Sequence, residues 1–136
     1  MDHSFSIISK FIAEEAELLG SPSKVFVGGF SQGCAMALMT HFNYPVPIGG
    51  TIGLSGAQCY DIDWSKVNIE ERNKTPMLLC HGTMDPMIPI KFAKQQAKIM
   101  EDHGVKFEFK DYPGLQHSLD MGEIRDIKNW LSEKMI

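Results

Sequence analysis

The pentapeptide from Gly29 to Gly33 reads Gly-Phe-Ser-Gln-Gly and fits the pattern G-x-S-x-G. An apolar run enters this segment and a helical pattern leaves it, which is the context of a sharp strand-to-helix turn that exposes a serine hydroxyl. We expect the two flanking glycines to remove side chains that would collide in such a turn. The hydroxyl of Ser31 is then a candidate nucleophile, and the backbone N–H of Gln32 is a candidate oxyanion-hole donor.

A serine hydroxyl becomes a good nucleophile only when a base takes its proton. His117 follows the last expected strand, and Asp85 follows the strand before it. Because parallel strands end at one edge of a sheet, both side chains are expected at the edge that carries Ser31. The order Ser31, Asp85, His117 is that of the α/β-hydrolases, in which the carboxylate orients the imidazole.

Other interpretations of these and neighbouring residues remain open. Taken alone, Asp85 could be a turn residue and His117 a neighbour of a helix cap. Their joint placement after successive strands favours a catalytic role for both. We interpret the remaining histidines, cysteines, methionines and tryptophan as structural or surface residues. The expected roles are a structural histidine at His81, surface histidines at His3, His41 and His103, packing at Cys34, Cys80 and Trp64, and mainly core positions for Met36, Met39, Met84 and Met87. The methionines near Ser31 could alternatively line an apolar acyl pocket.

The spacing of apolar residues predicts alternating helices and strands. Helices are expected over residues 4–19, 32–42, 89–103 and 120–136, and strands over residues 24–30, 48–54, 77–80 and 105–112. Residues 55–75 are polar and irregular, so a loop is expected there. This order predicts an α/β fold with about four mostly parallel strands flanked by helices, in one domain spanning residues 1–136.

Composition excludes several classes of protein. The formal net charge is −4 and the isoelectric point is near 5.7, so no electrostatic footprint for nucleic acid is present. No apolar stretch is long enough to span a membrane, and the amino-terminal residues do not resemble a secretory signal. Three scattered cysteines (Cys34, Cys59 and Cys80) do not suggest a disulfide framework, so a cytoplasmic location is expected. No metal-ligand spacing is visible, and no cofactor is expected.

Three segments together resemble the acyl-protein thioesterase and carboxylesterase family, also called the phospholipase/carboxylesterase group. They are Gly20–Lys24 leading into Gly28–Gly33, then His81-Gly82 with Asp85-Pro86 and Ile88-Pro89, and last Tyr112, Gly114 and His117-Ser118. The resemblance implies hydrolysis of fatty acyl esters or thioesters, including palmitoyl groups on proteins, through an acyl-serine intermediate. It implies an acylated protein, or a small acyl ester or lipid, as the substrate.

The chain also departs from the family pattern. Cys34 stands where the family usually has a further glycine. Family members begin with additional strands and a His-Gly-x-Gly-like loop that supplies a second oxyanion donor. The chain is therefore expected to be the C-terminal portion of an α/β-hydrolase fold, with a sheet edge at residues 24–30 open to self-association or a partner chain.

Two further functions remain as alternatives. One is a catalytically impaired hydrolase-like module that acts in binding or assembly. The other is dienelactone-hydrolase-like chemistry, which ranks lower because those proteins commonly carry cysteine at the position of Ser31.

Overall fold

The computed structural model describes residues 2–57 and 62–135. Within these residues it contains four strands and five α-helices, with two short 3-10 helices between them. The strands are β1 (Phe26–Phe30), β2 (Gly50–Leu54), β3 (Met77–Gly82) and β4 (Glu108–Tyr112). The helices are α1 (Asp2–Leu19), α2 (Gln32–Asn43), α3 (Ile69–Arg72), α4 (Ile90–Asp102) and α5 (Met121–Lys134), and the 3-10 helices are η1 (Pro22–Lys24) and η2 (Trp64–Lys66).

All four strands run parallel in the order β1-β2-β3-β4. This confirms the α/β fold of four parallel strands flanked by helices. The register aligns Phe30 with Leu54 and Leu54 with Cys80, so β1, β2 and β3 end side by side. The chain leaves each strand at the same edge of the sheet, and the loops that follow lie next to one another there.

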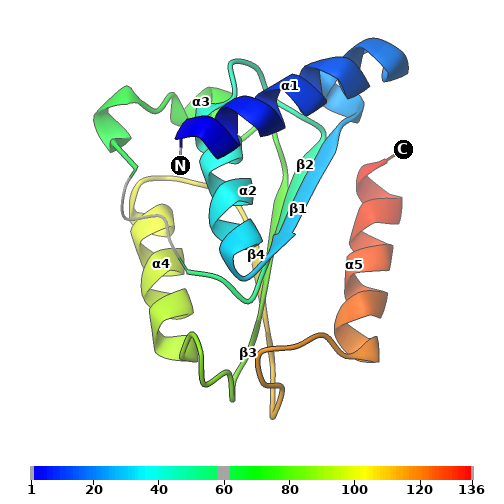
Figure 1. Ribbon diagram of the computed structural model, residues 1–136. Coiled ribbons are helices and arrows are strands. Elements are labelled where there is room, and N and C mark those ends of the chain that lie inside the picture. The colour runs from blue at the N-terminus through cyan, green and yellow to red at the C-terminus, as the bar shows by residue number, and fades with distance from the viewer. Residues whose placement is uncertain (1, 58–61, 136) are drawn as a thin grey trace.

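Side chains alternate along β3 and separate the core into two layers. Met77 and Leu79 pack with α2 and α4 on one face, whereas Leu78 and Cys80 pack with Trp130 of α5 on the other. Figure 1 shows α5 on one side of the sheet and α2 and α4 on the opposite side, and α1 packs against α2. Both faces of the sheet carry helices, as the near-continuous apolar pattern of a buried parallel strand requires.

Element boundaries differ from the expected ones for local reasons. Lys24 belongs to η1, whose first turn is capped by the side chain of Ser21, so β1 starts at Phe26. The N–H of Val105 donates to the carbonyl of Met100 and ends α4, so β4 starts only at Glu108. The expected loop over residues 55–75 contains η2 and α3, and Asn68 caps α3 by accepting a hydrogen bond from Glu71 N–H.

His41 was expected at the surface, but it is buried, with 2% of its surface exposed. The side chain faces the sheet, because the imidazole Nδ1 lies 2.9 Å from the hydroxyl of Thr51 on β2. The guanidinium of Arg72 donates to the carbonyl oxygens of His41 and Tyr44. Burial, together with the charge of Arg72, lowers the pKa of His41 to about 3. The prediction failed because the sequence pattern of this helix does not reveal that the His41 position faces the sheet.

Within the described residues, no helix is both long enough and apolar enough to cross a bilayer.

Candidate active site

Ser31 occupies the turn between β1 and α2, with backbone angles φ 59° and ψ −114°. Few residues other than glycine adopt a positive φ, so this conformation is strained and must be held by its surroundings. The Ser31 N–H donates to the carbonyl of Leu54 at 2.8 Å, which ties the turn to the end of β2. The turn therefore lifts the serine side chain off the carboxyl end of the sheet.

The two glycines of the motif have different surroundings. A Cβ atom on Gly29 would collide with the carbonyl group of Gly33, so the turn has no room for a side chain there. A Cβ atom on Gly33 would meet no atom within 4 Å. The expectation that both glycines prevent collisions is thus correct for Gly29 and wrong for Gly33 in the described part of the chain.

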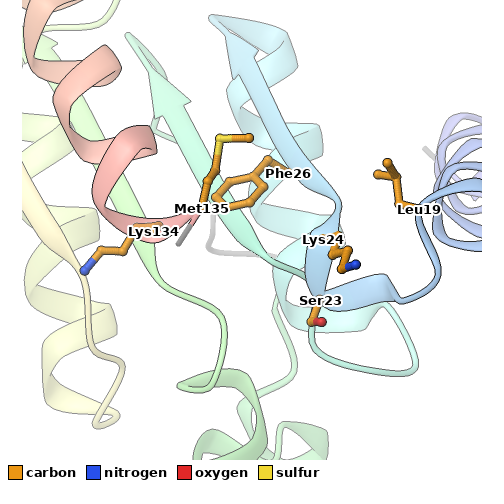
Figure 2. Close-up of a pocket in the computed structure, with 6 residues that line it drawn as sticks. All are labelled: Leu19, Ser23, Lys24, Phe26, Lys134 and Met135. Atoms are coloured by element: carbon orange, nitrogen blue, oxygen red, sulfur yellow. The ribbon is translucent and has the colours of Figure 1, made fainter.

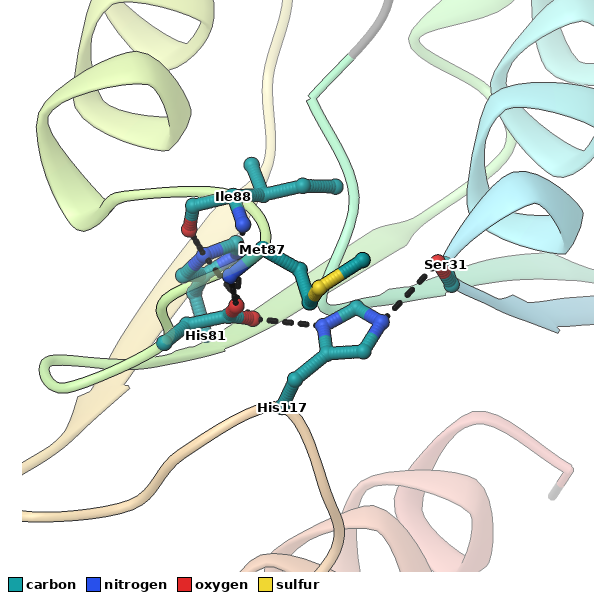
Figure 3. Close-up of polar contacts among 6 residues, drawn as sticks. Ser31, His81, Met87, Ile88 and His117 are labelled. Carbon is teal, nitrogen blue, oxygen red and sulfur yellow. Dashed lines mark hydrogen bonds and ion pairs between the residues drawn. The ribbon is translucent and has the colours of Figure 1, made fainter.

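Ser31, His117 and Asp85 lie in one hydrogen-bonded line (Figure 3). The Oγ of Ser31 is 3.0 Å from Nε2 of His117, and Nδ1 of the same ring is 2.7 Å from Oδ2 of Asp85. A carboxylate only accepts hydrogen bonds, so Nδ1 carries the imidazole proton and Nε2 accepts from the serine hydroxyl. The structure brings together the three side chains that the sequence singled out, from three loops at one sheet edge.

Asp85 is 4% exposed and uses both carboxylate oxygens. Oδ1 accepts hydrogen bonds from the backbone N–H groups of Met87 and Ile88, both at 2.9 Å, which leaves Oδ2 for His117. Burial by itself would raise the pKa of Asp85. Hydrogen bonds from the Ile88 N–H, from His117 and from the Met87 N–H outweigh that effect and hold its pKa below the usual value.

The loop that carries His117 is attached directly to the loop that carries Asp85. The N–H of Met84 donates to the carbonyl of Leu115, and the N–H of Gly114 donates to the hydroxyl of Thr83. A Cβ atom on Gly82 would collide with the carbonyl of Leu115, so glycine is what lets the two backbones approach this closely. These contacts set the position of the imidazole relative to the carboxylate.

Gln32 is the first residue of α2, and the first N–H groups of a helix have no acceptor within the helix. The ring of Phe30 lies 4.8 Å from the His117 ring, centroid to centroid, and is 38% exposed. Met84 and Met87 are 62% and 71% exposed, which corrects the expectation that they belong to the core. Their loop follows β3 at the sheet edge that carries Ser31 and His117, and its Met87 N–H donates to Asp85.

Sequence reasoning did not single out Ser55, which directly follows β2. It is fully buried and has φ 54°, and its N–H donates to the carbonyl of Cys80. Its hydroxyl has no hydrogen-bond partner in the described structure. A Cβ atom on the adjacent Gly56 would collide with Cys34 and approach the carbonyl of Ser31, so this segment packs directly against the nucleophile turn. The sequence feature that could have indicated this segment is the pair Ser55-Gly56 directly after a buried strand.

The other candidate residues have structural surroundings. His81 and Cys80 are buried at the end of β3, and Cys34 is buried on α2. Trp64 packs edge-on against Phe42 and stacks on His103 at 4.3 Å, centroid to centroid. Cys59 lies outside the described residues. Among those that are described, no group of three or more His, Cys, Asp or Glu side chains is arranged to hold a metal ion.

A hollow of about 480 Å³ lies at the opposite end of β1 from Ser31 (Figure 2). Six residues from η1, β1 and the ends of α1 and α5 line it, namely Leu19, Ser23, Lys24, Phe26, Lys134 and Met135. Ser31 follows the last residue of β1 whereas Phe26 is the first, so the hollow is separate from the hydrogen-bonded line of Ser31, His117 and Asp85.

A family model described as Phospholipase/Carboxylesterase matches residues 1–135. The chain belongs to the phospholipase/carboxylesterase family. The chain is 33% identical over 135 residues to a protein named acyl-protein thioesterase 1 from Kluyveromyces lactis. It is 35% identical over 130 residues to carboxylesterase SOBER1 from Arabidopsis thaliana. The alignments cover 97% and 96% of this chain but only 59% and 55% of those relatives. The chain thus spans less than two thirds of their length.

Solved structures of similar proteins have the same arrangement. The crystal structure of Arabidopsis thaliana SOBER1 matches with a TM-score of 0.88 at 32% identity, over 98% of this chain and 64% of that one. The structure of Zea mays acyl-protein thioesterase 2 matches with a TM-score of 0.75 at 27% identity, over 97% and 66% of the two chains. These likenesses agree with the α/β-hydrolase fold of the phospholipase/carboxylesterase family.

Proposed function

We propose that this chain is a serine hydrolase that cleaves carboxylic esters or thioesters of fatty acyl groups. The observation that carries the proposal is the continuous hydrogen-bonded line from Asp85 through His117 to Ser31. A hydroxyl, an imidazole and a buried carboxylate in that order are the components of nucleophilic acyl transfer. The names of the relatives, thioesterase and carboxylesterase, point to the same two substrate classes.

The proposed reaction proceeds in two halves. His117 takes the hydroxyl proton through Nε2 as Ser31 attacks the acyl carbonyl, and Asp85 stabilises the imidazolium that forms. The backbone N–H of Gln32, at the start of α2, donates to the developing oxyanion, which the helix dipole also favours. His117 then protonates the leaving alcohol or thiol. In the second half, water attacks the acyl-serine with His117 again acting as the base, and the fatty acid is released.

The surroundings of Ser31 fit an apolar acyl group. The ring of Phe30 packs beside His117, and the exposed side chain of Met87 belongs to the loop that carries Asp85. Burying these surfaces against an alkyl chain contributes about 25 cal/mol for each Å² removed from water. We include among the candidate substrates palmitoyl groups on proteins, as well as small acyl esters and lipids, and we place the activity in the cytoplasm.

The test is labelling of the purified full chain by a fluorophosphonate probe, which phosphonylates an activated serine with loss of fluoride. We expect labelling of the native chain and none of Ser31→Ala, with Ser118→Ala labelled as the native chain is, since Ser118 is an exposed serine beside His117. Hydrolysis of acyl esters and thioesters of increasing length then identifies the substrate. Absence of labelling in a chain whose circular dichroism shows it to be folded would contradict the proposal.

A binding role has one specific observation in its favour. Within the described residues β1 pairs only with β2, and the N–H of Ser31 and the carbonyl of Val25 both point toward β2. Because successive residues of a strand present their backbone groups to opposite sides, the N–H and C=O groups of Phe26, Gly28 and Phe30 point outward. Such an open edge can pair with a strand of another chain, which is the second candidate function.

A further inference from the structure

His81 lies at the carboxyl end of β3 with 1% of its surface exposed. Its Nε2 atom is 2.6 Å from the carbonyl oxygen of Ile88, seven residues further along the chain. A carbonyl oxygen only accepts hydrogen bonds, so the proton of the His81 ring must be on Nε2. The other ring nitrogen, Nδ1, is buried and has no hydrogen-bond partner in the described structure. In the described structure the His81 ring thus makes one hydrogen bond, and its acceptor lies in the loop that carries Asp85.

The bond from His81 closes that loop at its far end. Residues 83–89 connect β3 to α4, and the carbonyl of Ile88 points back across the loop to the ring of His81. Pro89 follows Ile88 and has no N–H, and a residue before proline is confined to extended backbone angles. With its carbonyl bound by His81, the peptide group between Ile88 and Pro89 has little freedom to rotate. This group meets the peptide group that carries the Ile88 N–H at the Cα atom of Ile88, so holding the first restrains the position of the second.

The same residue also holds the carboxylate of Asp85. The N–H of Ile88 donates to Oδ1 of Asp85 at 2.9 Å, and this leaves Oδ2 to accept from Nδ1 of His117 at 2.7 Å. Nε2 of His81 lies 3.6 Å from Oδ2, which is too long for a hydrogen bond. His81 and His117 are thus both close to the carboxylate, but only His117 shares a hydrogen bond with it.

We propose that His81 is a positioning residue of the active site, which acts through Ile88 to keep the Asp85 carboxylate aimed at His117. The inference rests on the proposed function, since the alignment matters when His117 serves as the base. The sequence of contacts is His81 Nε2 to Ile88 carbonyl, Ile88 N–H to Asp85 Oδ1, and Asp85 Oδ2 to His117. His81 does not touch the substrate, and it takes up or releases no proton in the reaction.

The charge state of Asp85 is consistent with this arrangement. Burial raises the pKa of Asp85, and the hydrogen bond from Ile88 N–H is the largest of the effects that lower it again. The titratable groups placed against Asp85 are His81 from β3 and His117 from the loop after β4. Releasing the Ile88 carbonyl should loosen the residue and weaken the hydrogen bond from its N–H, which should raise the pKa of Asp85 and let its carboxylate turn away from His117.

Three variants of the full chain separate positioning from general stability. His81→Phe removes the donor and keeps a ring, whereas His81→Gln keeps an amide donor at nearly the position of Nε2. His41→Phe is the matched control, because His41 is also a buried histidine with one hydrogen bond, to Thr51, but lies away from Asp85. Each variant is first checked by thermal unfolding, so that the later measurements are made only where it is folded.

We measure three quantities on each folded variant: the Asp85 carboxyl titration by ¹³C NMR, the His117 Nδ1 proton signal, and the rate of labelling by the fluorophosphonate probe. For His81→Phe we expect a higher Asp85 pKa, a weakened proton signal and labelling slower by about 10- to 100-fold, as misplaced catalytic groups cause. For His81→Gln we expect values close to those of the native chain. His41→Phe should lose stability without a change in any of the three.

Two results would overturn the proposal: native-like NMR values in His81→Phe, or a failure of His81→Gln to restore them. If His81→Phe does not fold, the comparison of His81→Gln with His81→Asn decides, because the shorter Asn amide cannot reach Ile88. The proposed function fails separately, when the native chain is not labelled at all. In that case the two NMR measurements still test whether His81 positions Asp85.

Discussion

Gly29 and Gly33 flank the same serine but differ in what a side chain would meet. At Gly29 a single methyl group would press on the carbonyl of Gly33, inside a turn already strained at Ser31. At Gly33 the added methyl group meets open space. The motif has glycine at both flanking positions, but only at Gly29 would a side chain collide with its surroundings. The two glycines can therefore be tested separately.

We expect Gly29→Ala to lower the free energy of unfolding by about 1–3 kcal/mol, as overpacking does, and to displace the Ser31 hydroxyl from His117. Gly33→Ala should leave the stability unchanged or slightly raised, since alanine is the better helix former at a position inside α2. Urea unfolding of both variants measures the difference. An equal decrease in the free energy of unfolding of the two variants would contradict the prediction that a side chain at position 29 collides with Gly33.

At this scale the sequence predicted the positions of Ser31, Asp85 and His117 because each follows a strand of one parallel sheet, and parallel strands end together. Burial was harder to predict. His41 and Met87 were assigned to the wrong environments because burial depends on which elements cover which, and a linear pattern does not contain that information. The positive φ of Ser55 could not be predicted either, because this residue is held by a contact distant in sequence, the hydrogen bond from its N–H to the carbonyl of Cys80.

At the scale of elements, α2 and α5 each bury a titratable side chain. His41 on α2 has a pKa lowered to about 3 by burial and by Arg72. Glu123 on α5 is fully buried with no hydrogen-bond partner described for either carboxylate oxygen, and its pKa is raised to about 7, first by burial and then by Asp120 and Asp126. The folded protein keeps both side chains uncharged at a pH where the unfolded chain would charge them.

The neutral, buried His41 contributes fully to the free energy of unfolding above the ordinary histidine pKa of 6.5, and this contribution is lost as the pH falls toward 3. The slope is about 1.4 kcal/mol per pH unit in that window. His41→Gln, which cannot titrate, should remove this loss. Urea unfolding between pH 4 and 7 measures it, and an unchanged slope in His41→Gln would contradict the buried, neutral state of His41.

The contribution of Glu123 to stability depends on pH in the opposite direction. The pKa of Glu123 is higher in the folded protein than in the unfolded chain, so its contribution to stability is complete below the ordinary glutamate pKa of 4.5 and is lost as the pH rises to about 7. Glu123→Gln should therefore stabilise the protein at neutral pH and leave the His41 dependence exposed between about pH 4.5 and 6.5. The same unfolding series tests this; a variant less stable than the native chain at pH 7.5 would contradict it.

At the scale of the whole molecule, the sheet has β1 at one side and β4 at the other (Figure 1). The outward-facing backbone of β1 includes Gly28, where an added Cβ would meet Ile52 only at an ordinary contact distance of 3.6 Å. Gly28 is therefore a position at which the edge can be altered while the pairing of β1 with β2 is retained.

We propose that this edge supports association between copies of the chain, and we expect sedimentation to show a molecular mass that rises with concentration. Gly28→Pro removes an outward N–H and should weaken the association, as proline does at natural sheet edges. Gly28→Ala keeps the N–H and should associate as the native chain does. Equal masses for the native chain and both variants at all concentrations would count against pairing through β1.

The close backbone contact at Gly82 and Leu115 also bears on how such a protein can be redesigned or can diversify. The segment after β3 and the segment after β4 share hydrogen bonds as well as this contact, so the position of each segment depends on the other. A change of length in either segment displaces the other. Grafting new substrate preference from a relative should therefore succeed when both segments are exchanged together and fail when they are exchanged singly.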